Sequence, residues 1–307
     1  MLATLFRKTT TPSFVYAAGL LLAAVAYRYT YQFEWRLDAE RMGSFLLEGG
    51  LALFTLLISN MYFRAYGFLK ENNFFLLFFA LIYCFLPASS YPWQEWLGLI
   101  ALFWAGVLYE RVPWKKSPEK NILDISLTLS LATLFDPINV LFFFLFYVGL
   151  FSNELKKTQF FLIPAITVAL LAFAVVSIAK LFELDVLRLH RVTQIDMQNL
   201  GLLIIRPFNF WMVGKACTMG YIISATFRPS QYGKQQKKAV QILLGFCLLS
   251  LGLTVFLLEG QQKELFFLPL IVFVAYRLLA AKRTTAQVNL WVTFLIIILW
   301  LRQGVPF

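Results

Sequence analysis

Long apolar runs recur along the whole chain and are separated by short polar connectors. At 1.5 Å per residue of helix, each run crosses much of a hydrocarbon layer about 30 Å thick. The pattern therefore predicts an all-α fold, a polytopic transmembrane helical bundle of about eleven spans. The predicted spans are residues 13–30, 43–61, 73–89, 95–109, 122–135, 137–152, 159–179, 207–226, 239–258, 265–281 and 287–301.

Two stretches leave alternatives open. Residues 122–152 read as two short helices that meet at Asp136-Pro137, and they either span twice or enter the membrane and return. The apolar run that ends at Ala26 resembles a signal peptide, but we favour an uncleaved first span because ten more follow. No connector is long enough for a separate folded domain, so residues 1–307 are predicted to form a single integral membrane domain.

Positive charge alternates in step with the predicted spans. Because cytoplasmic loops are enriched in Lys and Arg, the alternation predicts a cytoplasmic N-terminus and a periplasmic C-terminus in a bacterial inner membrane. Residues 31–42 then form the first periplasmic loop, and residues 180–206 form a periplasmic interfacial segment. The predicted cytoplasmic side holds Arg7, Lys8, Arg64, Lys70, Arg111, Lys115, Lys116, Lys120, Lys156, Lys157, Arg228, Lys234, Lys237, Lys238, Arg277, Lys282 and Arg283.

Composition agrees with a membrane chain and narrows its chemistry. Hydrophobic residues make up 60% of the sequence, too many for a soluble domain. The net charge of +11 is spread over short loops, so we expect membrane lipids and no nucleic acid as partners. A single histidine, His190, excludes sites that need several imidazoles. No CxxC, phosphate-binding loop or GxSxG motif is present, so no cofactor is expected.

Three acidic residues lie close together in the first periplasmic loop. They are Glu34, Asp38 and Glu40, and in a helix Glu34 and Asp38 would share one face. Such a pair can bind a divalent metal or act as a general base. The alternative is a solvated surface helix, because Arg36 and Arg41 are spaced to pair with these carboxylates.

The interfacial segment 180–206 carries basic residues on the side where the orientation rule disfavours them. Interleaved leucines suit a helix lying in the membrane interface. There the basic side chains could bind a lipid phosphate, Arg by a bidentate fork. Simple snorkelling to lipid headgroups explains them equally well. The residues in question are Arg188, His190, Arg191 and Arg206.

Polar residues also fall within the predicted spans. Lys215 lies near mid-membrane, where Asp136 and Glu48 are candidate partners, unless the span boundary is shifted and Lys215 snorkels. Ser126, Ser130 and Thr133 form a stripe on one helix face. Helix packing by small hydroxyl residues explains the stripe, and a substrate-lining wall is the alternative.

The layout resembles a family of flavobacterial-type multi-pass inner-membrane proteins, a domain of unknown function. The matching parts are the opening 5–9 and the stretch from Glu110-Arg111 through Lys120 to Asp124, leading into the 131–137 hairpin. A looser architectural similarity is to polyprenyl-phosphate-dependent membrane glycosyltransferases. That similarity implies a catalytic role for Glu34, Asp38 and Glu40 and phosphate binding by Arg188, Arg191 and Arg206.

Three functional hypotheses remain open at this stage. The leading one is the handling of a lipid-linked substrate, such as a polyprenyl phosphate, at the periplasmic face, by glycosyl transfer or lipid processing. The second is a transporter or flippase that uses Lys215 and the hydroxyl stripe. The third is a non-enzymatic assembly or scaffold subunit with an envelope protein partner. Whether the protein is an enzyme is therefore left open.

Overall fold

The computed structural model describes most of the chain, and all regular elements in the described residues are helices. This confirms the all-α class for that part of the chain. The described residues are 5–7, 11–32, 39–69, 72–86, 93–111, 118–135, 137–152, 158–181, 210–227, 236, 240, 243–245, 264–280 and 284–304. The helices are α2 (Thr11–Gln32), α3 (Ala39–Ala65), α4 (Phe74–Tyr83), α5 (Trp93–Arg111), α6 (Pro118–Phe135), the 3₁₀ helix η1 (Pro137–Val140), α7 (Leu141–Ser152), α8 (Thr158–Leu181), α11 (Phe210–Phe227), α13 (Glu264–Leu279) and α14 (Thr285–Gly304).

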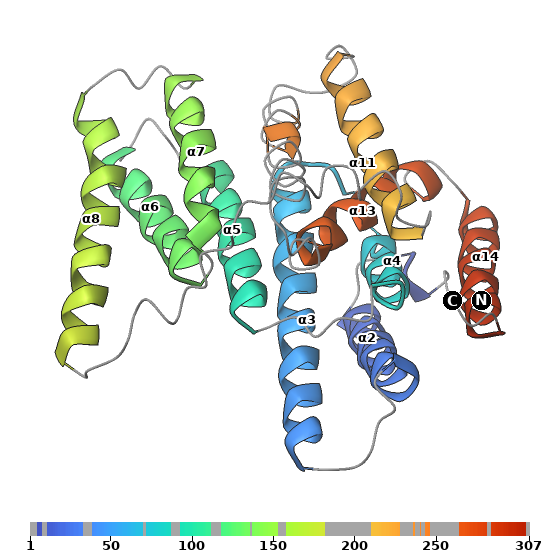
Figure 1. Ribbon diagram of the computed structural model, residues 1–307. Coiled ribbons are helices and arrows are strands. Elements are labelled where there is room, and N and C mark those ends of the chain that lie inside the picture. Colours follow the sequence, from blue (N-terminus) through green and yellow to red (C-terminus); the bar gives the residue numbers. More distant parts are fainter. Residues whose placement is uncertain are drawn as a thin grey trace, which may run out of the picture. The chain divides into compact units, whose positions relative to one another are not determined.

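The chain divides into two compact units. Unit 1 contains Met1–Trp93, Arg206–Leu244 and Gln261–Phe307, and unit 2 contains Gln94–Ile205 and Gly245–Gly260. In Figure 1 the blue and cyan helices α2 to α4 of unit 1 lie beside its orange and red helices α11 to α14. Segments from the two ends of the sequence therefore build one helical unit.

Unit 1 is organised around α4. All residues of this helix except Leu81 are buried, and it packs against α2, α3, α13 and α14. A helix that is apolar on every side is found in a protein core or in lipid, and α4 is covered by neighbouring helices of the protein. The chain tightens into i→i+3 hydrogen bonds through Leu86 and then meets Pro87, which disfavours helix in the residue before it.

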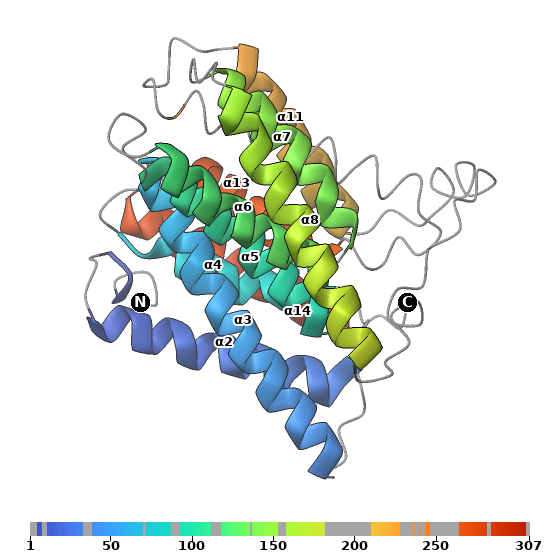
Figure 2. The same ribbon diagram turned by 90° about the vertical axis from the view of Figure 1, so that its left-hand side faces the viewer.

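Unit 2 contains α5 to α8, drawn in green in Figure 2. Its most extensive contact is between α6 and α8. The predicted break at Asp136-Pro137 coincides with the end of α6 and the start of η1. The buried Asn139 side chain donates to the carbonyl of Ala132 (3.0 Å) and so satisfies an acceptor that the end of α6 leaves open.

Two of the described helices are long and apolar enough to cross a membrane. They are Met42–Ala65 within α3 and Thr158–Ser177 within α8. Shorter apolar segments occur at Phe74–Tyr83, Leu141–Leu150, Phe267–Leu279 and Thr285–Ile298. The predicted span 239–258 falls largely outside the described residues. The structure therefore establishes a helical chain with two membrane-length helices, a coarser statement than eleven spans.

Helices α2 and α3 both extend into residues 31–42, the range predicted to form the first periplasmic loop. Helix α2 continues to Gln32 and α3 already begins at Ala39, so Glu40 belongs to a helix. The apolar runs end earlier than the helices do, because polar residues at a helix end still complete its backbone hydrogen bonds. The connector is thereby reduced to residues 33–38.

Candidate functional site

A buried ion pair joins the first two helices of unit 1. The Arg28 guanidinium on α2 donates from Nη1 to Oε1 of Glu48 on α3 at 2.6 Å. Arg28 is fully buried and Glu48 is 9% exposed. Taking two charges out of water costs several kcal/mol per ion, so such a pair persists only with good geometry and further hydrogen bonds.

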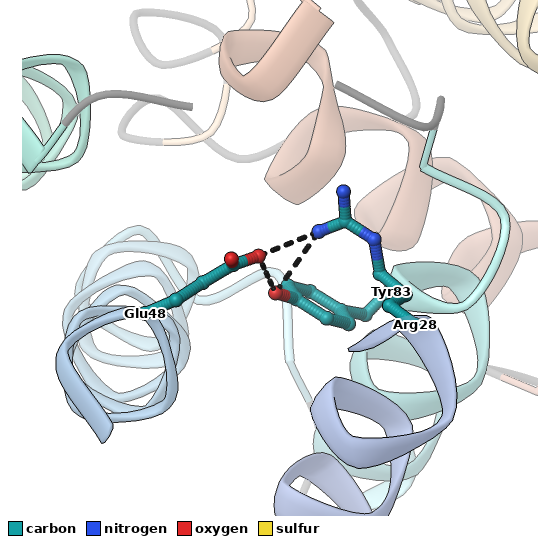
Figure 3. Close-up of polar contacts among 3 residues, drawn as sticks. All are labelled: Arg28, Glu48 and Tyr83. Atoms are coloured by element: carbon teal, nitrogen blue, oxygen red, sulfur yellow. Dashed lines mark hydrogen bonds and ion pairs between the residues drawn. The ribbon is translucent and has the colours of Figure 1, made fainter. Parts of the chain in front are cut away.

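The Tyr83 hydroxyl takes part in further hydrogen bonds to both members of the ion pair. The fully buried Tyr83 at the end of α4 donates its hydroxyl to Oε1 of Glu48 and accepts from Arg28 Nη1 at 3.1 Å. The Arg28 guanidinium carbon also lies 5.2 Å from the centre of the Tyr83 ring. Figure 3 shows the three side chains meeting between their helices. We call Arg28, Glu48 and Tyr83 the charge network.

The charge network ties three helices together at one point. Arg28 lies one turn before the end of α2, and Glu48 lies in the first half of α3. A second contact close by is the edge-to-face packing of Tyr29 on Phe45, with ring centres 5.6 Å apart. The two helices that flank residues 33–38, α2 and α3, are therefore held together by the charge network and by the contact of Tyr29 with Phe45. That connector carries Glu34 and Asp38.

Most of the site residues predicted from the sequence lie outside the described residues. Glu34, Asp38 and Asp136 are among them, and so is the whole basic group of Arg188, His190, Arg191 and Arg206. Glu40 belongs to the first turn of α3. Whether the acidic and basic groups approach one another stays a prediction.

Lys215 packs against an aromatic ring. It lies on α11, is half-buried, and its Nζ is 5.2 Å from the centre of the Phe267 ring on α13, a cation–π distance. The preceding Gly214 allows the close approach, because an added Cβ would lie 3.0 Å from Ile271. Glu48, a partner considered for Lys215 from the sequence, pairs with Arg28.

The predicted hydroxyl stripe lies on α6 and is largely turned inward. Ser126 and Ser130 are buried, and Thr133 is half-buried. Ser126 and Thr133 donate to carbonyls one turn back in α6, those of Ile122 (2.6 Å) and Leu129 (2.9 Å). Among the described residues, the Ser130 hydroxyl has no hydrogen-bond partner. These bonds suit helix packing, the simpler of the two interpretations of the stripe.

Sequence reasoning found Glu48 but missed Arg28 and Tyr83. Arg28 lies inside the predicted span 13–30, but it was not considered as a partner of Glu48. A usable signal existed. Arg28 and Glu48 lie inside two consecutive predicted spans, 13–30 and 43–61, and opposite charges in neighbouring spans are candidates for pairing. Tyr83 gave no such signal, because tyrosines near span ends are ordinary interfacial residues.

No group of three or more His, Cys, Asp and Glu side chains able to hold a metal ion occurs among the described residues. No protein-family model, no curated protein and no solved structure matches this chain. Function is therefore inferred from the chain's own residues.

Proposed function

We propose that the protein is a multi-pass protein of the bacterial inner membrane, with about eleven spans, that handles a lipid-linked substrate at the periplasmic face. The membrane setting is supported by the distribution of polar and apolar residues, which is the opposite of that in a soluble protein. Arg28, Glu48 and Asn73 are buried, whereas Phe173 is 72% exposed and Leu290 67% exposed. In water, exposed apolar surface is costly and buried charge is rare. Both are ordinary in lipid, where charged side chains face the bundle interior.

Helix α8 provides the strongest support for the membrane setting. An 18-residue stretch within Thr158–Ser177 has a mean hydropathy of 2.5, and 17% of that stretch is buried. A soluble protein buries such a helix in its core. Hydrocarbon contact explains why so apolar a helix leaves most of its surface uncovered by protein.

The proposed chemistry belongs to the connectors on the periplasmic side. Asp38 or Glu34 would act as base or metal ligand, and Arg188, Arg191 and Arg206 would bind the substrate phosphate. The charge network supports this assignment, because it fixes the helices from which the acidic connector 33–38 emerges. Side chains supported by fixed helices are already in position before the substrate binds, so less conformational entropy is lost on binding.

The test is lipid analysis of the gently purified protein by mass spectrometry. We expect a polyprenyl phosphate or another anionic lipid-linked species to co-purify with the wild-type protein and to be lost in Asp38→Asn and Arg191→Ala. Asp124→Asn on α6 is the matched control, since it makes the same change on the predicted cytoplasmic side. Wild-type levels of this lipid in both site variants would contradict the proposal.

A scaffold subunit of an envelope assembly is the second candidate, and one observation favours it. Arg28, Glu48 and Tyr83 satisfy one another inside the protein and need no substrate to do so. A scaffold would co-purify with a stoichiometric protein partner and would tolerate Asp38→Asn and Arg191→Ala.

For the transporter alternative, Lys215→Leu should abolish transport but be neutral or stabilising in a scaffold.

A further inference from the structure

Two separate polar networks join the same three helices, α2, α3 and α4, at opposite ends. The charge network is one of them. The other, which we call the Asn73 network, consists of Ser13 on α2, Asn60 and Arg64 on α3, and Asn73 at the N-cap of α4. At 1.5 Å per residue, the two networks lie about 22 Å apart along α2 and about 24 Å apart along α3. Each network therefore holds one end of this three-helix group.

Asn73 is the centre of the second network. Its side-chain oxygen accepts from Arg64 Nη2 (2.8 Å), and its side-chain amide donates to the buried Ser13 hydroxyl. Arg64 donates in addition to the Asn72 carbonyl (3.0 Å) and to Asn60 Oδ1 (3.3 Å). Every acceptor in these bonds is a neutral oxygen, and arginine keeps its charge in proteins. No group in the Asn73 network therefore changes its charge when the pH falls.

The charge network differs because it contains a carboxylate. Among the described side chains of the neighbouring helices, the charged or titratable groups that face Glu48 are Arg28 and Tyr29 on α2 and Tyr83 on α4. Arginine and tyrosine keep their protons between about pH 8 and about pH 4, whereas carboxylates gain protons towards the lower end of this range. Glu48 is therefore the group whose charge changes.

Helix α13 also packs against α3, but at the other end. The charged or titratable side chains described on α13 are Tyr276 and Arg277. Tyr276 interacts electrostatically with Arg64, and Arg277 Nη1 donates to the carbonyl of Phe68 at 3.5 Å. Both lie near the Asn73 network, so neither faces Glu48.

The two charged side chains of the network differ in their access to water. The Glu48 side chain is 10% exposed and the Arg28 side chain 0%. A proton can therefore reach the carboxylate before the helices separate. Protonation would leave the buried Arg28 charge without its carboxylate, a strongly unfavourable state. Because Arg28 lies one turn before the end of α2, an outward movement of this helix end would bring its long side chain to the polar membrane surface.

We propose that the charge network is a pH-dependent switch. When Glu48 gains a proton, the ends of α2 and α3 that flank residues 33–38 move apart, while the Asn73 network holds the opposite ends together. Between the two networks, α2 buries only apolar residues, namely Ala17, Leu21, Ala24 and Val25. Such packing is non-directional and can adjust when one helix end moves. The proposal rests on the membrane setting above and not on the periplasmic chemistry; the proposed orientation decides only that acid on the periplasmic side operates the switch.

The first experiment measures distances at both ends of the α2–α3 pair by double electron–electron resonance. The protein is held in phosphatidylcholine nanodiscs and titrated from about pH 8 to about pH 4. We expect a longer distance at low pH for the outer label pair and an unchanged distance for the inner pair. An unchanged outer pair, or an equal change in both pairs as in acid unfolding, overturns the proposal. The labelled cysteines replace exposed residues, Thr30 and Leu47 for the outer pair and Val15 and Leu57 for the inner pair, after Cys84, Cys217 and Cys247 are changed to alanine.

The second experiment assigns the switch to Glu48. Glu48→Gln imitates the protonated carboxyl group, so its outer pair should show the longer distance already at about pH 8. Glu119→Gln is the matched control, because it removes an exposed carboxylate on α6 and should keep the wild-type pH response. The double variant Arg28→Met/Glu48→Leu should keep the shorter distance throughout, since it has no charge to release. The shorter distance in Glu48→Gln, or a wild-type pH response in the double variant, refutes the switch.

Tyr83→Phe keeps the proposal testable if Glu48→Gln does not fold. This variant removes a hydrogen bond to the ionised carboxylate. Its outer pair should therefore lengthen at a pH about one unit higher than in the wild type, the shift expected for one charge-assisted hydrogen bond. Lengthening at the wild-type pH or below it would count against the switch. Failure to co-purify a lipid-linked substrate would leave the switch standing, because the distances do not depend on that substrate.

Discussion

At the scale of single residues, the pairing of Arg28 with Glu48 gives the largest expected effect. Glu48→Gln leaves the buried Arg28 charge without its carboxylate, so the free energy of unfolding should fall by about 3–5 kcal/mol. Thermal unfolding of the purified protein in detergent measures the loss. Tyr83→Phe is the milder comparison, since it removes only a hydroxyl from the same network and should cost about 1 kcal/mol.

The double variant Arg28→Met/Glu48→Leu separates a structural role from a functional one. It removes both charges together, so its unfolding temperature should be close to that of the wild type or above it. If this variant is stable but retains less lipid-linked substrate, the network contributes to the periplasmic site. An unfolding temperature for Glu48→Gln equal to that of the wild type would mean that the ion pair does not hold the helices together.

The sequence predicted part of this network and not the rest, for a physical reason. A carboxylate within an apolar run is conspicuous by itself, so Glu48 was identified as a candidate. The cation that meets it depends on how two helices cross, and the packing of α2 against α3 decides that. The outer groups, Glu34 and Asp38 with Arg188 and Arg191, lie outside the described residues, so their arrangement stays a prediction.

At the scale of helices, α8 offers a direct test of lipid exposure. Phe173 is 72% exposed on this helix. Phe173→Lys should lower the membrane-integrated fraction in alkaline extraction, because a lysine within a span costs up to about 2.5–3.5 kcal/mol on insertion, the value for a helix centre. Phe173→Leu is the control and should integrate normally. A normal integrated fraction for Phe173→Lys would indicate that water, and not lipid, covers this face.

Helices α5 and α7 meet at a glycine, and this contact predicts a size-dependent effect. The Tyr109 hydroxyl on α5 donates to the carbonyl of Gly149 on α7 at 3.1 Å, and an added Cβ would lie 2.8 Å from that hydroxyl. Gly149→Ala should therefore destabilise the protein by about 1–3 kcal/mol in thermal unfolding. Gly220→Ala is the control, since no atom lies within 4 Å of an added Cβ there. Equal unfolding temperatures of the two variants would refute the close contact.

Helix positions were predictable because apolar runs and prolines are local signals. The end of α6 before Pro137 follows from the restriction that proline places on the preceding residue. The same restriction at Pro87 was not used, because the predicted span 73–89 runs through this proline whereas α4 ends at Tyr83. Helix lengths at polar ends were less accurate. Glu40 was expected in a loop, yet it is part of α3, because charged residues fit the first turn of a helix as well as they fit a connector.

At the scale of the whole molecule, the proposed orientation makes a prediction about sidedness. Reporter fusions at positions 35 and 195 should both report the periplasm, and fusions at 116 and 282 should report the cytoplasm. Alkaline phosphatase is active outside and green fluorescent protein fluoresces inside, so the two reporters check each other. If positions 35 and 195 fall on opposite sides, the acidic and basic connectors cannot share a substrate, and the periplasmic site is wrong.

The charge network also has a consequence for biosynthesis. Arg28 leaves the ribosome 20 residues before Glu48, an interval of about 1–4 seconds at ordinary translation rates. During that interval the nascent chain contains Glu34, Asp38 and Glu40 but not Glu48, the carboxylate that pairs with Arg28 in the folded protein. Helices α2 and α3 are therefore expected to enter the bilayer together as a helical hairpin. Helix α4 is expected to pack against them later, when Tyr83 has been synthesised and can join the charge network. A nascent chain stopped before Glu48 is synthesised should remain at the insertion machinery, whereas one that includes α3 should move into the lipid.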